Sequence, residues 1–158
     1  GSEMCIRDSL RTEGTNGVLN FGKQFTQRPT RLKGYFKYTS VEINKSNDEM
    51  KYLIGQPDTC QIFIALGDWS EPVEIRTKPS DRKLFDKNDP HIIAYADMYS
   101  GKSVTEYTPF TLELEYRDTD RIPTYIVIVA SASKYGDYFT GGDGSVLFLD
   151  DFTLEYDY

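Results

Sequence analysis

Two short stretches of the sequence combine aromatic and polar side chains in contexts that are typical of surface turns. Gly67-Asp68-Trp69-Ser70 places the single tryptophan after a strand-like run, and residues 135–139 place three aromatic residues and an aspartate in one loop. Aromatic faces pack on the apolar faces of sugar rings, and planar polar side chains bind hydroxyl groups. Packing in the core or at its rim is the open alternative for each aromatic residue. The candidates are Trp69, Tyr99, Tyr135 and Tyr138 for stacking, with Lys134 and Asp137 as hydroxyl partners.

The acidic pair Asp150-Asp151 lies in a strand-like run near the end of the chain. Simple alternation places Asp150 on the same face as the apolar residues Phe148 and Phe152, and an inward carboxylate must be hydrogen-bonded, paired or bound to a metal. Two interpretations stay open. Asp150 and Asp151 could bind a structural calcium ion with backbone carbonyls, or Asp150 could cap the N–H groups of a neighbouring loop. A β-bulge between the two residues would exchange their roles.

Other site chemistries find little support in the sequence. The single histidine, His91, directly follows Asp89-Pro90, which favours a strand-edge residue over the base of a nucleophilic triad or a metal ligand. The glycine-rich run 141–145 lacks the spacing of a phosphate-binding loop. A glycoside hydrolase needs two facing carboxyl groups, and the context marks out no pair among the 25 acidic residues. We therefore expect a protein that is not an enzyme, with a carboxylate-pair hydrolase as the alternative.

The elements that would position these residues are strands. Phe110, Leu112, Leu114 and Tyr116 alternate with polar residues. Cys60, Ile62, Ile64 and Leu66 form another stripe, although Phe63 and Ala65 make its second face partly apolar, and the run 126–132 is apolar on both faces. About eight such strands, separated by Gly, Pro, Asp and Asn turns, predict an all-β fold: an antiparallel β-sandwich, specifically a jelly roll. Ser46 to Met50 offers a start for one helical turn.

Residues 1–9 do not resemble the rest of the chain. Gly1-Ser2 is typical of the pair left by cleavage of a tag, and Glu3 to Ser9 resembles a translated sequencing-adapter fragment of metagenomic origin. We therefore expect residues 1–9 to be disordered and residues 10–158 to form a single domain. With Cys5 set aside, Cys60 is a lone cysteine in a strand, which indicates a buried small hydrophobic residue.

Composition limits the partners that this chain could bind. The formal net charge is −7, with 18 Lys and Arg residues against 25 Asp and Glu residues, so nucleic acid and anionic membrane surfaces would be repelled. No apolar run approaches the length of a membrane span. Tyrosine leads the aromatic residues, with 12 Tyr, 9 Phe and 1 Trp.

The stretch from Ile126 to Tyr156 contains, in order, an apolar strand, a serine-rich step, Lys-Tyr-Gly-Asp-Tyr-Phe-Thr-Gly-Gly, a Gly-Ser pair and a strand with Asp-Asp. This order closely resembles the C-terminal signature of the putative carbohydrate metabolism domain family of Bacteroidetes. Segments 89–95 and 107–110 resemble the middle of that family, and 18–22 its opening. Ala132 and Asp143 are small departures from the family pattern.

The resemblance implies a jelly roll similar to carbohydrate-binding modules, in which a structural calcium ion is a possible cofactor. It further implies the C-terminal domain of a larger polysaccharide-utilisation lipoprotein in the cell envelope, at the outer-membrane surface or in the periplasm. A glycan is the expected ligand, and an immunoglobulin-like domain of the same protein is a possible partner. No established catalytic residues can be transferred. The signature 134–144 is open to two interpretations, a structural corner or a ligand contact, of which the structural corner is slightly favoured.

Three functions therefore stay open on the sequence. The first is a non-catalytic carbohydrate-binding module, which follows from the resemblance and from the tyrosine-rich composition. The second is a structural or adhesion domain that contacts other proteins. The third is a glycoside hydrolase that uses a carboxylate pair.

Overall fold

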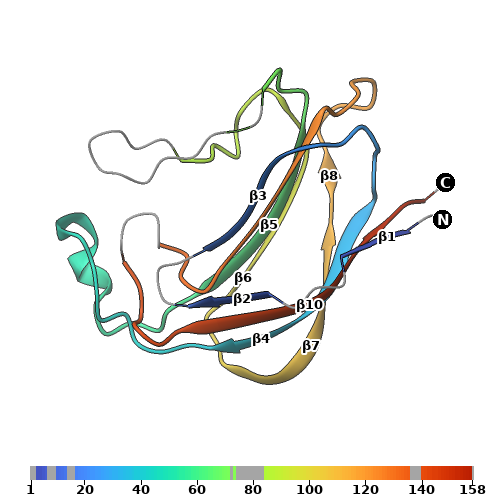
Figure 1. The fold of residues 1–158 in the computed structure, drawn as a ribbon. Helices are drawn as coiled ribbons and strands as arrows, with labels where there is room; N and C mark the ends of the chain where they lie inside the picture. Colours follow the sequence, from blue (N-terminus) through green and yellow to red (C-terminus); the bar gives the residue numbers. More distant parts are fainter. Residues whose placement is uncertain are drawn as a thin grey trace.

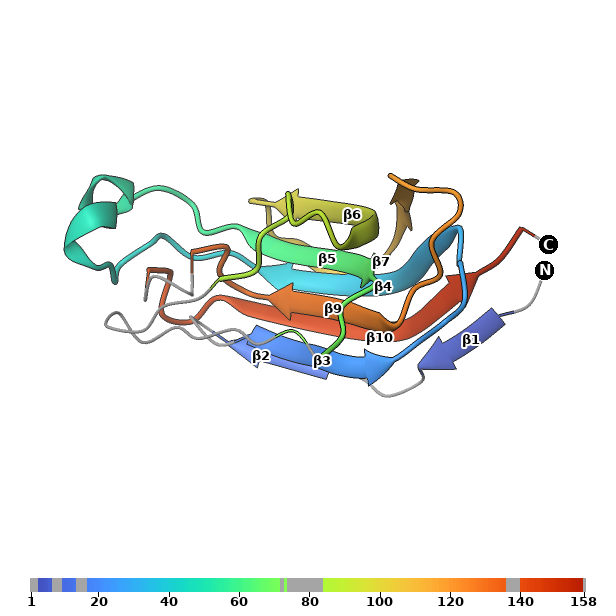
Figure 2. The same ribbon diagram turned by 90° about the horizontal axis from the view of Figure 1, so that it is seen from above.

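The computed structural model describes residues 3–6, 10–13, 17–71, 73, 84–135 and 140–157, with side chains described from Lys23 onward. These residues form an antiparallel β-sandwich, which confirms the predicted all-β class, whereas the jelly-roll connectivity stays a prediction. Figures 1 and 2 show two layers of strands, with a short helix at the end of the molecule opposite the two termini. That helix, η1 (Asp48–Leu53), is the only one in the described ranges, and it is too short to cross a membrane.

Sheet A contains five strands in the order β1-β10-β4-β7, with β2 also paired to β10. Their bounds are β1 (Glu3–Ile6), β2 (Leu10–Glu13), β4 (Arg31–Thr39), β7 (Val104–Glu113) and β10 (Val146–Glu155). Sheet B contains five strands in the order β3-β9-β5-β6-β8. Their bounds are β3 (Gly17–Gln24), β5 (Cys60–Gly67), β6 (Ile92–Ser100), β8 (Glu115–Tyr116) and β9 (Tyr125–Ser131). Leu114 separates β7 from β8, so the chain passes there from sheet A to sheet B.

Residues 3–6 form a strand although we expected the first nine residues to lie outside the fold. β1 pairs with β10 over Glu3↔Glu155 to Ile6↔Phe152. Ladder hydrogen bonds use backbone groups alone, so a free strand edge can pair with a segment of almost any sequence. Residues 1, 2 and 7–9 lie outside the described residues.

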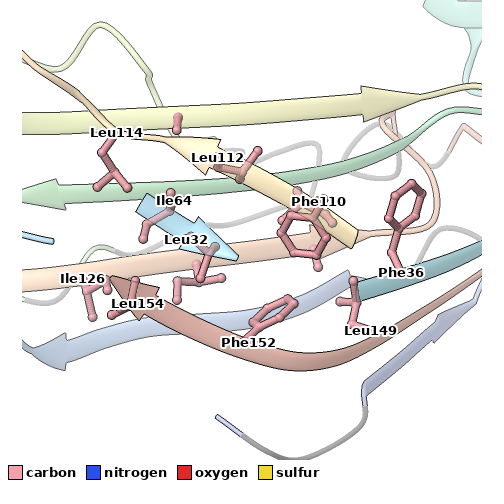
Figure 3. Packing of buried hydrophobic residues seen from close by; sticks show 14 of the residues in the cluster. Leu32, Phe36, Ile64, Phe110, Leu112, Leu114, Ile126, Leu149, Phe152 and Leu154 are labelled. Carbon is pink, nitrogen blue, oxygen red and sulfur yellow. The ribbon is translucent and has the colours of Figure 1, made fainter. Parts of the chain in front are cut away.

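The main core lies between the two sheets and is built from the alternating positions of the strands. Cys60, Ile62, Ile64 and Leu66 are fully buried, as the alternation in this run predicts. Facing them from sheet A are large apolar side chains, several of which are drawn in Figure 3: Leu32, Phe36, Phe110, Leu112, Leu149, Phe152 and Leu154. Removal of this apolar surface from water is the main force that stabilises the sandwich.

A second, smaller cluster covers the outer face of sheet B. Phe63 and Val129 point outward from β5 and β9, and the connection between β5 and β6 brings Trp69 and Phe85 onto them. The ring centroids of Phe63 and Phe85 lie 5.0 Å apart, and those of Phe85 and Tyr95 lie 6.4 Å apart in a stacked arrangement. The middle of this outer face is therefore apolar and covered, which leaves its two ends for polar side chains.

Candidate functional site

Three of the six residues predicted to contact carbohydrate lie together at one end of the outer face of sheet B. Tyr99 is near the end of β6 and 43% exposed, and Lys134 and Tyr135 follow β9. On β5, Gln61 is in register with Tyr99. We call the group Gln61, Asp97, Tyr99, Lys134 and Tyr135 the Tyr99 patch.

Hydrogen bonds link the strand residues of the Tyr99 patch. The Tyr99 hydroxyl donates to Asp97 Oδ2 at 3.3 Å and accepts from Gln61 Nε2 at 3.3 Å. Asp97 Oδ2 also accepts from the Tyr95 hydroxyl at 3.1 Å. The Asp97 carboxylate is thereby held at a fixed place on the sheet. Sequence reasoning missed Gln61 and Asp97, although the alternation Tyr95-Asp97-Tyr99 places the three on one face.

Lys134 lies against two aromatic rings of the patch. Its Nζ is 4.5 Å from the Tyr99 ring centroid and 5.2 Å from that of Tyr135, which is the range of cation–π contacts. The Lys134 backbone N–H donates to the Thr59 carbonyl at 2.7 Å, which fixes the start of this loop against the start of β5. The ammonium group is therefore positioned beside the Tyr99 ring rather than free in solvent.

The surroundings of the Tyr99 hydroxyl disfavour its ionisation. Burial, followed by the nearby Asp97 carboxylate, raises the pKa of Tyr99 above its ordinary value, and the same two causes raise the pKa of Tyr95. The patch combines the Lys134 amine and the Gln61 amide as donors with the Asp97 carboxylate as acceptor, beside half-exposed aromatic surface. Donor, acceptor and aromatic groups of these kinds are those that the hydroxyl groups and apolar faces of sugars require.

Trp69 lies away from the Tyr99 patch and packs in the second cluster. It is only 8% exposed, and its ring lies so close to Gly67 that a Cβ there would be 2.4 Å from Trp69 Cζ3. Its indole Nε1 donates to Asp89 Oδ2 at 3.1 Å. Trp69 therefore packs in a hydrophobic cluster, which was the alternative to sugar stacking in the sequence analysis. The remaining two candidates, Asp137 and Tyr138, lie outside the described residues.

Part of the signature 134–144, with the residues that flank it, is held around a buried carboxylate that the sequence did not single out. Asp58 is fully buried, and its Oδ2 accepts from Ser133 Oγ at 2.6 Å, Gly142 N at 2.8 Å and Ser145 Oγ at 2.8 Å. Its Oδ1 accepts from Thr59 N at 2.9 Å. Gly142 has no room for a side chain, because a Cβ would lie 2.8 Å from the Val41 carbonyl oxygen. These parts of the signature therefore act as a structural corner.

A β-bulge corrects the predicted orientation of the Asp150-Asp151 pair. The register of β10 against β4 shifts between Asp150 and Thr153, and Asp151 adopts a positive φ of 51°. The buried residues of β10 are consequently Leu147, Leu149, Phe152 and Leu154, and Asp150 shares the outer face with Phe148. Asp150 Oδ1 accepts from Asp151 N at 3.0 Å. The described residues contain no group of three His, Cys, Asp or Glu side chains that could hold a metal ion.

A polar network joins the loops at the other end of sheet B. Arg121 bridges Asp68 Oδ2 at 3.1 Å and Asp118 Oδ2 at 3.0 Å, and His91 Nδ1 lies 3.0 Å from Asp68 Oδ1. Partial burial opposes ionisation of Asp68, but the His91 and Arg121 contacts outweigh it, so the pKa of Asp68 lies below its usual value. His91 thus lies at one end of a polar network just before β6, in keeping with a strand-edge position.

Two solved structures resemble this chain over most of its length, and both are described as putative glycoside hydrolases. The one from Bacteroides thetaiotaomicron is 26% identical with a TM-score of 0.66, and the match covers 87% of this chain and 40% of that one. The one from Bacteroides vulgatus is 26% identical with a TM-score of 0.63, and the match covers 85% and 54%. This chain therefore spans about half or less of each matched protein. The comparison with curated proteins gives no match.

A family model agrees with the signature found in the sequence. The model is described as a putative carbohydrate metabolism domain, and it matches residues 4–155. That range runs from β1 through the last residue of β10 and includes residues of every strand of both sheets. The chain therefore belongs to the putative carbohydrate metabolism domain family.

Proposed function

We propose that this chain is a non-catalytic carbohydrate-binding domain whose ligand contacts the Tyr99 patch. The observation that carries the proposal is the grouping of Tyr99, Lys134 and Tyr135 with a fixed carboxylate, Asp97, on an outer sheet face. Membership of a carbohydrate-related family supports the ligand class.

The geometry of the patch sets the kind of binding that we expect. Tyr99 is 43% exposed and stands on a strand rather than in an enclosed cavity, so a sugar would keep part of its surface in water. Such contacts leave little binding energy after the cost of association, which predicts weak affinity for one sugar and higher affinity for repeated units. Weak binding to a polymer that offers many sites suits a domain that retains a polysaccharide.

The chain offers a closely matched control for a test of the Tyr99 patch. Tyr107 on β7 of sheet A is 40% exposed, and Lys37 Nζ lies 4.5 Å from its ring, as Lys134 Nζ does for Tyr99. A glycan array probed with the wild type, Tyr99→Ala and Tyr107→Ala would therefore compare two tyrosines that differ mainly in location. We expect the wild type and Tyr107→Ala to bind the same glycans, and Tyr99→Ala to lose at least about 80% of the signal. Equal binding by both folded variants would refute this site.

A glycoside hydrolase is the second candidate, and the descriptions of the two similar Bacteroides structures favour it. Among the described residues of the patch, Asp97 supplies the only carboxylate, and Asp137 lies outside them. Incubation of the purified chain with polysaccharides, followed by a reducing-end assay, tests this candidate. If the wild type releases reducing ends and Asp97→Asn does not, the chain is a glycoside hydrolase rather than a non-catalytic binding domain. Glycan binding without release of reducing ends supports the non-catalytic function.

The proposal places this domain in an envelope protein that takes up polysaccharides, next to an immunoglobulin-like domain. The greater length of the matched solved chains supports a multidomain arrangement. A structural calcium ion at Asp150 and Asp151 also stays a prediction. If calcium is bound there, a chelator lowers the melting temperature and Asp150→Asn removes that effect. A blank glycan array for a stable protein would instead favour a structural or adhesion domain.

A further inference from the structure

Residues at the other end of sheet B line a hollow of about 380 Å³. At this end β3 and β5 end and β9 begins, as the ribbon in Figure 1 shows. Its lining comes from three segments that are distant in sequence. The lining residues are Gln24, Thr26, Trp69, Ser70, Thr124 and Tyr125. None of them belongs to the Tyr99 patch.

The walls of the hollow are fixed by backbone and side-chain hydrogen bonds. Gln24 is in register with Tyr125 across β3 and β9. The Thr124 hydroxyl lies 2.7 Å from the Trp69 carbonyl and 3.2 Å from the Gly67 carbonyl, and it donates to this pair. The Thr124 N–H also donates to the Gly67 carbonyl at 2.9 Å. The turn that carries Trp69 and Ser70 is therefore tied to the start of β9, so the hollow is already formed without a ligand.

The lining chemistry is that of a site for a neutral, hydroxylated ring. Two aromatic residues line the hollow: Tyr125, which is half-buried, and Trp69, which is largely buried and only 8% exposed. Gln24 provides an amide that both donates and accepts, and Thr26 and Ser70 provide exposed hydroxyl groups. No lining residue carries a formal charge at neutral pH, in contrast to the Tyr99 patch with its Lys134 and Asp97. The volume also lies within the range of small-molecule sites, roughly 300–1,000 Å³.

We propose that this hollow is a second carbohydrate subsite, which binds a neutral sugar unit of a glycan. The inference rests on the proposed function for its ligand class, but its location is independent of the Tyr99 patch. Both places lie on the same outer face, because Tyr125 and Ser131 of β9 have the same parity and pair with Gly67 and Gln61 of β5. Six residues separate them, or about 20 Å along the strand. One oligosaccharide of several units could therefore contact both sites, whereas a single sugar could not.

Trp69 makes the test direct, because it is the only tryptophan in the chain. Its fluorescence reports on the hollow and not on the Tyr99 patch. The probes are four soluble neutral polysaccharides: xylan, galactomannan, mixed-linkage β-glucan and arabinan. We expect at least one of them to change the Trp69 emission in a saturable way. In Gln24→Ala the apparent affinity should fall about fivefold, as expected for the loss of a hydrogen-bonding amide. Gln27→Ala is the matched control, since Gln27 is exposed in the same segment but does not line the hollow.

The variants separate this inference from the proposed function. One outcome supports the hollow as a sugar-binding site, even if the Tyr99 patch fails its own test. In that outcome the saturable change in Trp69 emission persists in Tyr99→Ala, but the apparent affinity falls in Gln24→Ala or Thr26→Ala. The second variant keeps the test valid if the first does not fold. Glycan binding on the array with unchanged Trp69 emission overturns the hollow and leaves the Tyr99 patch standing. Equal titrations of wild type, Gln24→Ala and Thr26→Ala also overturn it, as does no emission change with any of the four polysaccharides.

Discussion

Replacement of Asp58 tests the structural corner that supports the Tyr99 patch. The Asp58 carboxylate is fully buried and accepts hydrogen bonds from three points of the segment 133–145, at Ser133, Gly142 and Ser145. In Asp58→Ala these donors lose their acceptor. The same segment carries Lys134 to its place beside Tyr99.

The size of the effect follows from the groups that are left without partners. The Gly142 N–H is fixed in the backbone, and a buried donor without an acceptor costs about 2 kcal/mol. The hydroxyl groups of Ser133 and Ser145 can rotate toward other acceptors, so each costs about 1 kcal/mol. We therefore expect Asp58→Ala to lower the free energy of unfolding by about 4 kcal/mol, and the melting temperature of a chain of this length by about 10 °C. Asp58→Asn keeps one oxygen and should cost about half as much.

Urea unfolding followed by circular dichroism measures this loss. Asp143→Ala is the matched control, because Asp143 is exposed in the same loop and its carboxylate makes a surface ion pair with Lys45 at 3.4 Å. A surface pair of this kind contributes at most about 1 kcal/mol. A loss below about 1 kcal/mol in Asp58→Ala, or an equal loss in both variants, would refute the role given to the corner.

Three further outcomes follow from the structure. Gly142→Ala places a Cβ 2.8 Å from the Val41 carbonyl oxygen, so urea unfolding should show a loss of about 2 kcal/mol, and an unchanged midpoint would contradict the tight fit. Burial raises the pKa of the Cys60 thiol to about 12, so in Cys5→Ser a thiol reagent should label Cys60 only when urea unfolds the protein. Rapid labelling of the native protein would contradict this burial. Backbone N–H groups of Arg121 and Asp120, with the Arg121 side chain, lower the pKa of Asp118. Asp118→Asn should therefore be less stable than wild type above the unfolded pKa of about 3.9, and this difference should vanish as pH falls through the lower folded pKa. A difference that is constant across that range would contradict the assignment.

The strands could be predicted from sequence wherever alternation continued without interruption. The run from Cys60 to Leu66 was correctly predicted as a strand with one face in the main core. The run of β9 was correctly predicted as a strand that is buried on both faces. Alternation failed at Asp151, where one extra residue in β10 reversed the face of every residue before it. A bulge is a local change of register that depends on the neighbouring strand, so the residues of β10 alone do not reveal it.

The candidate site was predictable in part, for a similar reason. Tyr99, Lys134 and Tyr135 were named because aromatic and basic residues in loops and strand ends are distinctive. Their meeting depends on the pairing of β5 with both β6 and β9, which no local pattern encodes. Trp69 was placed correctly after a strand, but its burial depends on Gly67 and on the segment that carries Phe85.

Asp58 was missed because one aspartate before a strand is a common turn residue. Its three partners from the segment 133–145 lie at least 75 positions away in the sequence. The signature 134–144 could thus be recognised from the sequence, whereas the role of the Asp58 carboxylate, which orders the residues beside it, could not.

Chemical-shift mapping of the backbone amide groups decides whether a glycan contacts the Tyr99 patch. The isotopically labelled protein is titrated with the glycan that binds best on the array, and the perturbed residues are compared with the two sheet faces. We predict saturable shifts at Gln61, Asp97, Tyr99 and Lys134, with little change at Tyr107 on the outer face of sheet A. Shifts confined to sheet A, or a glycan that binds without perturbing the Tyr99 patch, would contradict the proposed function.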